Sequence, residues 1–151
     1  MIELNSAGLP SAAIEIRVPF YDVDLAGIVW HGHYLKYFEL ARDELLRGIG
    51  YSYGEMRESG FLWPVVDTSI RYVNPLVLEQ SARVTACLKE WELRIVIDYE
   101  IHDEKGDLCT RGKTIQVPVD AKTQLLQLGS PDLLIDSVQR YIDSQVKKTD
   151  K

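Results

Sequence analysis

The sequence predicts an α+β protein in which an antiparallel sheet curls around one long helix. Apolar residues alternate with polar ones in several separate runs, the pattern of strands with one buried face. Between the first run and the later ones, residues 33–47 repeat apolar side chains at helical spacing. Their apolar surface is so broad that a sheet must cover it. Turn signals join the later strands, which favours antiparallel pairing.

Length and composition fit a single domain with a packed core. The chain has 151 residues, of which 46% are hydrophobic and 26% charged, ordinary values for a globular protein. The net charge of −6 argues against binding of nucleic acid, which needs a basic face. No apolar run reaches the length of a membrane span and no signal peptide is evident, so we expect a cytoplasmic protein. Cys87 and Cys109 lack CxxC spacing and are expected to be free, buried thiols.

The first elements follow from periodicity and from glycine and proline. Residues 1–13 show no periodicity and are expected to form a flexible N-terminal arm, so that the single domain spans 14–151. Residues 14–20 alternate and predict a strand, which Pro19 ends. A helix follows over 33–47 and ends at Gly48 and Gly50. Its apolar stripe consists of Tyr34, Phe38, Ala41 and Leu45, widened by Leu35, Tyr37 and Leu46.

The second half predicts a short helix, four strands and a final helix. The short helix covers residues 52–59, before Gly60. The period then changes to two, which predicts strands in a meander, with a hairpin turn at 104–107. The strands are expected at 61–73, 83–89, 94–102 and 109–117. The last helix is expected over 131–146, with Ser130 as N-cap and Pro131 at the first helical position. A single sheet around one helix leaves an edge strand uncovered, so we expect dimerisation.

Polar and titratable residues crowd into residues 21–34, the turn between the first strand and the long helix. Asp22 and Asp24 are followed by Gly27, His31 and His33. Such residues contribute little to a core, whereas a helix start supplies unpaired backbone N–H groups and a positive dipole end. This turn is therefore the first candidate for a site of chemistry.

These residues form a motif, and the motif resembles a known family. Tyr21-Asp22-x-Asp24-x-x-Gly27-x-Val29-x-His31-x-x-Tyr34, followed by Phe38-Glu39-x-Ala41-Arg42, is similar to the hotdog-fold thioesterases of the 4-hydroxybenzoyl-CoA thioesterase type. These include short-chain acyl-CoA thioesterases linked to the Tol–Pal system. Tyr72-x-x-Pro75 and the stretch from Gly112 to Asp120 also fit, in the same order. The resemblance implies the hotdog fold, homodimers that share active sites across their interface, and often a homotetramer built as a dimer of dimers.

The resemblance assigns catalytic roles to Asp24 and His31. Asp24 matches the catalytic carboxylate, which either attacks the thioester carbonyl or deprotonates a water molecule. The alternative is an aspartate that only caps the helix or closes an Asx-turn, and Asp22 is expected to do no more than shape the turn. The His31 side chain would hydrogen-bond the carboxylate or the substrate, and its backbone N–H would polarise the carbonyl. The alternative is a histidine at the helix entry with no chemical role.

Further residues are expected to bind substrate. The motif implies Gly27, Val29, Gly32, Tyr34 and Glu39: Gly27 forms a turn, Gly32 allows close approach of a ligand or neighbouring chain, and Glu39 is a partly buried acid. Arg94 and Lys113 are basic residues on strands that could reach a CoA phosphate; the alternative is a solvated strand face. Trp91 is followed by Glu92-Leu93-Arg94 rather than by the basic cluster of aromatic-CoA enzymes, so an acyl-carrier-protein substrate stays open.

The function expected from all these residues is hydrolysis of an acyl-CoA thioester to a carboxylic acid and CoA. Two alternatives remain: a hotdog dehydratase, and a non-catalytic protein that binds acyl thioesters. A metal site made by His31, His33 and the two aspartates is disfavoured, because residues two apart on a helix point to different faces. No GxSxG or GxGxxG motif is present, and we expect neither a metal nor a cofactor.

Overall fold

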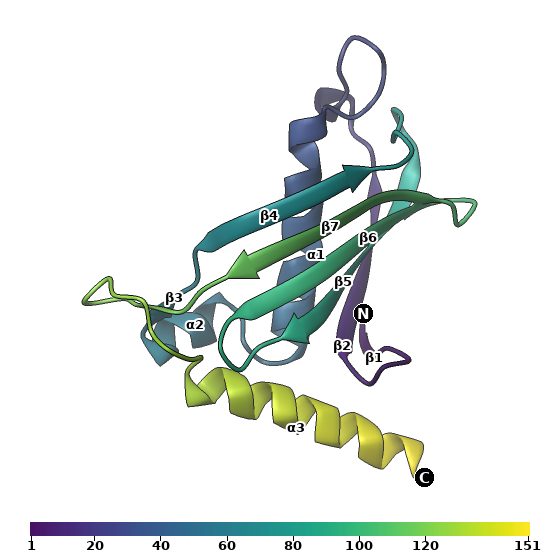
Figure 1. Cartoon of the computed structure of the whole chain (residues 1–151). Coiled ribbons are helices and arrows are strands. Elements are labelled where there is room, and N and C mark those ends of the chain that lie inside the picture. Colours follow the sequence, from purple (N-terminus) through teal and green to yellow (C-terminus); the bar gives the residue numbers. More distant parts are fainter.

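A computed structural model describes all 151 residues and contains one six-stranded antiparallel sheet with a long helix against one face (Figure 1). The helix is α1 (Tyr34–Gly48). The strands lie in the order β1 (Ile2–Leu4), β2 (Pro10–Arg17), β5 (Ser81–Glu90), β6 (Ile95–Asp103), β7 (Leu108–Gln116) and β4 (Val65–Tyr72). Strands β3 (Phe61–Leu62) and β8 (Val119–Asp120) form a separate pair. The expected α+β class is confirmed.

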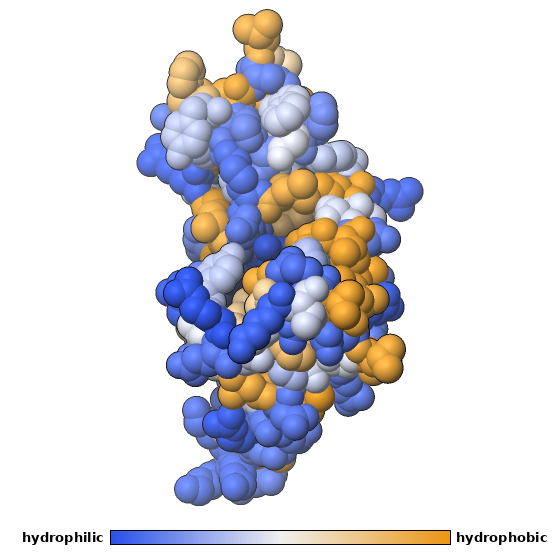
Figure 2. All heavy atoms as spheres, turned by 90° about the vertical axis from the view of Figure 1, so that its left-hand side faces the viewer, coloured by the Kyte–Doolittle hydropathy of each residue, from blue (hydrophilic) through white to orange (hydrophobic).

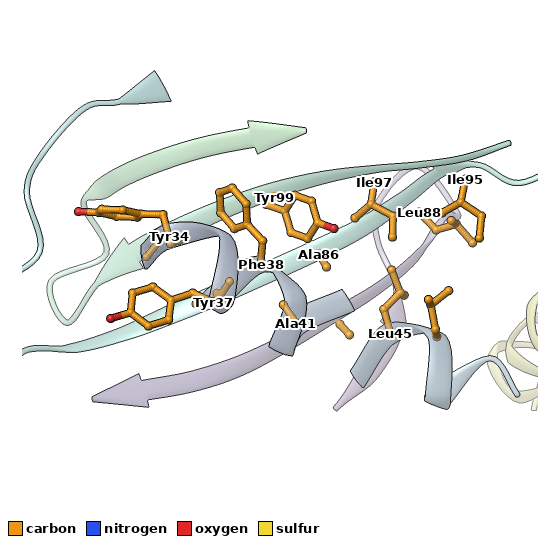
Figure 3. Packing of buried hydrophobic residues seen from close by; sticks show 14 of the residues in the cluster. Tyr34, Tyr37, Phe38, Ala41, Leu45, Ala86, Leu88, Ile95, Ile97 and Tyr99 are labelled. Carbon is orange, nitrogen blue, oxygen red and sulfur yellow. The ribbon is translucent and has the colours of Figure 1, made fainter. Parts of the chain in front are cut away.

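Helix α1 packs on the sheet through the stripe that the sequence predicts. Its buried residues face the inner side chains of β5 and β6, as Figure 3 shows. The Phe38 ring stacks on Tyr99 with a centroid distance of 4.4 Å. Gly112 on β7 makes this contact fit, because a Cβ there would lie 2.3 Å from the Phe38 ring. Leu35, expected to widen the stripe, is instead exposed.

Glycines follow the ends of α1 and of the short helix after it, as the sequence predicts. Gly50 has φ of +85° just after α1, and Gly60 has φ of +75° just after α2 (Tyr53–Ser59). Left-handed backbone of this kind strongly favours glycine and ends a helix. At the start of α2, Ser52 and Glu55 form a capping box. The predicted helix over 52–59 is confirmed.

The N-terminal residues do not form the flexible arm expected for 1–13. Residues Ile2–Leu4 pair with Pro10–Ala12 as a hairpin, and Ala12 is buried in the core. Gly8, with φ of +75°, provides the turn, which is closed by a hydrogen bond from the Gly8 N–H to the Asn5 carbonyl. The boundary at residue 14 is therefore wrong, because β2 already begins at Pro10.

The strand order differs from the expected meander. Of the strands in the predicted meander, only β5, β6 and β7 are consecutive neighbours; β4 pairs with β7 at one edge, and β5 pairs with β2. The chain therefore crosses the sheet between β4 and β5. This leaves β4 as an edge strand, and seven of its eight side chains are exposed. The sheet ends in β1 on one side and in β4 on the other, and the exposed edge strand that the sequence predicts is present as β4.

The C-terminal helix α3 (Asp132–Thr149) starts one residue later and ends three residues later than expected. Pro131 is the N-cap residue rather than the first helical one, and the Ser130 hydroxyl donates to the Trp91 carbonyl instead of capping the helix. Leu134 and Val138 are buried on the inner face of α3. None of the helices has the length and apolar content required to cross a membrane.

Candidate active site

The loop between β2 and α1 folds back on itself as a small hairpin that presents Asp24. The Asp24 N–H donates to the Ile28 carbonyl at 2.9 Å, and the Gly27 N–H donates to the Asp24 carbonyl at 3.0 Å. Gly27 has φ of +76°, so the turn needs a glycine, as expected. The Asp24 Oδ1 accepts from the Ala26 N–H at 2.8 Å, which is the Asx-turn of the alternative interpretation. Asp24 is exposed, and its Oδ2 makes no hydrogen bond within the chain.

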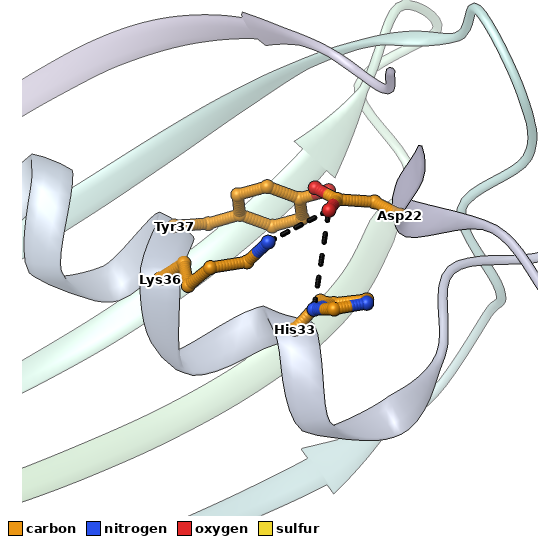
Figure 4. A network of polar contacts seen from close by, with 4 residues as sticks. All are labelled: Asp22, His33, Lys36 and Tyr37. Carbon is orange, nitrogen blue, oxygen red and sulfur yellow. Dashed lines mark hydrogen bonds and ion pairs between the residues drawn. The ribbon is translucent and has the colours of Figure 1, made fainter. Parts of the chain in front are cut away.

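Asp22 has the opposite environment (Figure 4). Its side chain is 2% exposed and accepts from the Lys36 Nζ at 2.7 Å and the Tyr37 hydroxyl at 2.6 Å. The His33 Nδ1 lies 3.9 Å away. Burial acts to raise the pKa of Asp22, but the hydrogen bonds from Lys36 and Tyr37 outweigh it and hold that pKa below its usual value. Asp22 thereby fixes the loop to the first turns of α1.

His31 begins a short 3-10 helix, His31–His33, that leads directly into α1. The backbone N–H groups of His31 and Gly32 donate no hydrogen bond within the chain, as expected at a helix start. The Tyr72 hydroxyl donates to the His31 carbonyl at 2.6 Å and ties this segment to the end of β4. The His31 side chain is exposed, and no hydrogen bond or ion pair joins it to Asp24.

Three residues expected around the substrate turn out to support the loop. Val29 is buried, and its N–H donates to the Leu76 carbonyl at 2.9 Å. Tyr34 is buried, and its hydroxyl accepts from the Leu76 N–H at 3.4 Å. A Cβ at Gly32 would lie 2.2 Å from the Trp30 indole, so the close approach at Gly32 is made by the chain itself. Within one subunit Val29 and Tyr34 contact the chain itself, and their expected contact with substrate stays a prediction.

The charged candidates do not gather at this loop. Glu39 is exposed rather than partly buried, and it lies between two hollows on α1. Lys113 is on the sheet face opposite α1, with its Nζ 3.9 Å from the Asp98 carboxylate. Arg94 pairs with Glu90 between β5 and β6. Tyr72, which holds His31, pairs with Thr110, and Thr110 pairs with β6 near the end of that strand. Arg94 lies just before the start of β6, about 20 Å from that pairing at the usual rise per strand residue.

The sequence reasoning missed three supporting residues: Lys36 and Tyr37, which bind Asp22, and Tyr72, which holds His31. Tyr72 was noticed only as part of a motif. Lys36 and Tyr37 lie in the first turn of α1, where side chains can reach back to the preceding loop. This position in the sequence is the signal that could have indicated their contact with Asp22.

Comparison with known proteins now places the chain in a family. Residues 18–146 match the model of the thioesterase-like superfamily. The chain belongs to the thioesterase-like superfamily. One relative is a Bacillus subtilis protein, provisionally named acyl-CoA thioesterase YneP. It is 32% identical to this chain over 110 residues, which cover 72% of this chain and 80% of the relative.

Solved structures show the same fold. A DHNA-CoA thioesterase from Staphylococcus aureus is 26% identical to this thioesterase-like protein, covers 93% of each chain and has a TM-score of 0.74. An aspartate-to-asparagine mutant of 4-hydroxybenzoyl-CoA thioesterase in complex with 4-hydroxybenzoyl-CoA is 23% identical, covers 85% of this chain and 98% of its own, and has a TM-score of 0.74. The hotdog fold and the thioesterase family expected from the motif are confirmed.

Proposed function

We propose that this protein hydrolyses acyl-CoA thioesters to a carboxylic acid and CoA, with Asp24 as nucleophile or general base. The observation that carries the proposal is the contrast between the two motif aspartates. Asp22 is buried and bound by Lys36 and Tyr37, so its carboxylate is already used. Asp24 is exposed on the same loop and keeps Oδ2 free of hydrogen bonds within the chain. The names of its relatives as acyl-CoA thioesterases support the same reaction.

The chemistry follows from the groups at the loop. Either the Asp24 carboxylate attacks the thioester carbonyl, CoA leaves as a thiolate and water hydrolyses the resulting anhydride, or Asp24 takes a proton from a water molecule that attacks directly. Both routes place negative charge on the carbonyl oxygen. The free N–H groups of His31 and Gly32 are the donors available to stabilise that charge. The departing thiolate takes up a proton to give CoA.

The proposal includes a homodimer built on β4. The outer edge of β4 offers unpaired backbone groups, and exposed Val65, Val66 and Tyr72 lie along this strand. Figure 2 shows hydrophobic atoms gathered across the middle of the side on which β4 and α2 lie. A long exposed edge of this kind pairs readily with another copy, and a closed pair satisfies both edges. The dimer of dimers and the Tol–Pal link implied by the resemblance stay predictions.

The decisive experiment measures release of free CoA with a thiol reagent. Asp24→Asn keeps the shape and removes the charge, so kcat is expected to fall about a hundredfold or more with little change in KM. Asp22→Asn is the matched control and is expected to lower kcat less. Near-normal turnover by Asp24→Asn would refute the assignment, and the reverse ranking would move the role to Asp22.

The same assay separates the alternatives. A dehydratase would produce an enoyl absorbance without thiol, and a protein that only binds thioesters would produce neither. Running the assay with an acyl-carrier-protein thioester beside the CoA thioester decides which carrier is used. A kcat/KM higher for the carrier protein would replace CoA as the substrate in this proposal.

A further inference from the structure

One peptide group between the Asp24 loop and α1 is held by side chains from two directions. It joins His31 to Gly32, so it carries the His31 carbonyl and the Gly32 N–H. The carbonyl accepts from the Tyr72 hydroxyl at 2.6 Å, whereas the N–H donates no hydrogen bond within the chain. Because this N–H is one of the two donors available to the thioester in the proposed reaction, the groups that hold its peptide matter to that reaction.

Tyr72 reaches the peptide from the edge strand. It is the last residue of β4, where it pairs with Thr110 on β7. Its ring meets the Tyr34 ring edge to face, with a centroid distance of 5.0 Å and an interplanar angle of 75°. Tyr34 is itself buried, and its hydroxyl accepts from the Leu76 N–H. The strand and the Tyr34 ring therefore direct the Tyr72 hydroxyl to the His31 carbonyl.

The Trp30 indole packs against the same peptide at the glycine. A Cβ at Gly32 would lie 2.2 Å from this indole, so the ring rests directly on the glycine α-carbon. The rings of His31 and His33 lie against the indole with centroid distances of 4.9 Å and 5.2 Å. The peptide is thus held at its carbonyl by Tyr72 and at its α-carbon by Trp30.

A hydrogen bond to the carbonyl acts on the N–H of the same peptide in two ways. The peptide is planar and trans, so its C=O and N–H point in opposite directions and fixing one fixes the other. Hydrogen bonds in a chain polarise one another, so a donor at the carbonyl oxygen makes the N–H a stronger donor. The carbonyl can only accept, which makes the Tyr72 hydroxyl the donor. Burial raises the pKa of that hydroxyl, so it keeps its proton at neutral pH.

We propose that Tyr72 is a positioning residue for oxyanion stabilisation: its hydroxyl orients the His31–Gly32 peptide and strengthens the Gly32 N–H as a donor to the carbonyl oxygen of the thioester. The inference rests on the proposed function and adds a residue of the edge strand to that site. Negative charge develops on the carbonyl oxygen when the thioester is attacked. A donor that is already oriented and polarised therefore lowers the barrier more than it aids substrate binding.

The first test is Tyr72→Phe, which removes the hydroxyl and keeps the ring against Tyr34. Release of CoA is measured with the best substrate from a panel running from acetyl-CoA to benzoyl-CoA. We expect kcat to fall about three- to tenfold with KM little changed, because the N–H remains but is weaker and less well oriented. Tyr141→Phe is the matched control on α3, where the hydroxyl has no hydrogen-bond partner, and should leave both constants unchanged. An unchanged kcat, or an effect confined to KM, overturns the inference while the hydrolase assignment stands.

A double-mutant cycle tests whether Tyr72 acts through the Gly32 N–H. Gly32→Pro removes that N–H. Gly32→Ala is its control, because both variants add a Cβ beside Trp30 and only alanine keeps the N–H. Tyr72→Phe should lower kcat in the Gly32→Ala background and leave it unchanged in the Gly32→Pro background. Equal effects in the two backgrounds overturn the inference.

Isotope-edited infrared spectroscopy measures carbonyl polarisation without turnover. In Asp24→Asn the thioester should stay bound, and hydrogen bonds to its carbonyl lower the stretching frequency. The lowering should be smaller when Tyr72→Phe is added to Asp24→Asn and unchanged when Tyr141→Phe is added. A residue that only stabilises the fold would not move this frequency, so identical frequencies overturn the inference. Circular dichroism and light scattering check that each variant keeps its fold and assembly.

A wild-type protein that releases no CoA would refute the proposed function. The infrared comparison of the wild-type protein with Tyr72→Phe then still decides whether Tyr72 strengthens a donor to the carbonyl of bound benzoyl-CoA. A smaller lowering in Tyr72→Phe supports that role, and an equal lowering or no bound carbonyl signal overturns it.

Discussion

Replacing Asp22 by asparagine should destabilise the protein measurably at neutral pH. Both carboxylate oxygens accept from donors, Oδ1 from Lys36 and Oδ2 from Tyr37, so an amide satisfies one of them and presents N–H groups to the other. A hydrogen bond to a charged group contributes about 1.5–3 kcal/mol. The Lys36 side chain is 50% exposed, so its ion pair adds no more than about 1 kcal/mol. We expect Asp22→Asn to lower the free energy of unfolding by roughly 2–4 kcal/mol.

The stabilisation by Asp22 should also depend on pH, which gives a second test of the same prediction. The pKa of Asp22 is lowered in the folded protein, so its stabilisation is fully present above the unfolded pKa of about 3.9 and is lost as pH falls through the folded pKa. Urea denaturation followed by circular dichroism at several pH values measures this. The difference between wild type and Asp22→Asn should be large at pH 7 and should shrink as the pH falls below about 4. A difference below about 0.5 kcal/mol at pH 7, within the range of ordinary surface substitutions, or one independent of pH, would refute the reasoning.

Three further predictions concern the site, the core and the assembly. His31→Ala should lower kcat less than Asp24→Asn, because the backbone N–H survives; equal losses in the thiol-release assay would make the side chain a catalytic acid or base. Gly112→Ala places a methyl group 2.3 Å from the Phe38 ring and should cost about 1–3 kcal/mol of stability by urea denaturation, with no loss contradicting the packing described. Light scattering at micromolar concentration should show at least a dimer, and a fully active monomer would exclude a shared site.

The sequence predicted the elements better than their neighbours in the sheet. The capping box at Ser52 and the glycines at positions 50 and 60 are local signals: the capping box begins α2, and the glycines follow the ends of α1 and α2. The crossover between β4 and β5 has no local signal, since a turn such as Asn74-Pro75 looks the same whether the next strand pairs beside it or across the sheet. The hairpin at residues 2–12 was missed because strands this short show no clear alternation.

For the site, the motif assigned different roles to the two aspartates, and the structure adds the difference in their surroundings. Asp22 is buried through contacts with Lys36 and Tyr37 from another element, whereas Asp24, two positions away, is exposed. Spatial neighbours of this kind are set by packing, which periodicity does not encode.

The two cysteines, finally, bear on how the enzyme can be assayed. Cys109 is buried on β7, and Cys87 is partly buried on β5, where its Sγ accepts from the Asn5 amide at 3.2 Å. Burial raises the pKa of both thiols. Thiol reagents react with the thiolate, which such residues rarely form at neutral pH. A reagent that reports CoA should therefore read the reaction product continuously in the presence of the folded enzyme, and a burst of one or two extra thiols per chain would report unfolding instead.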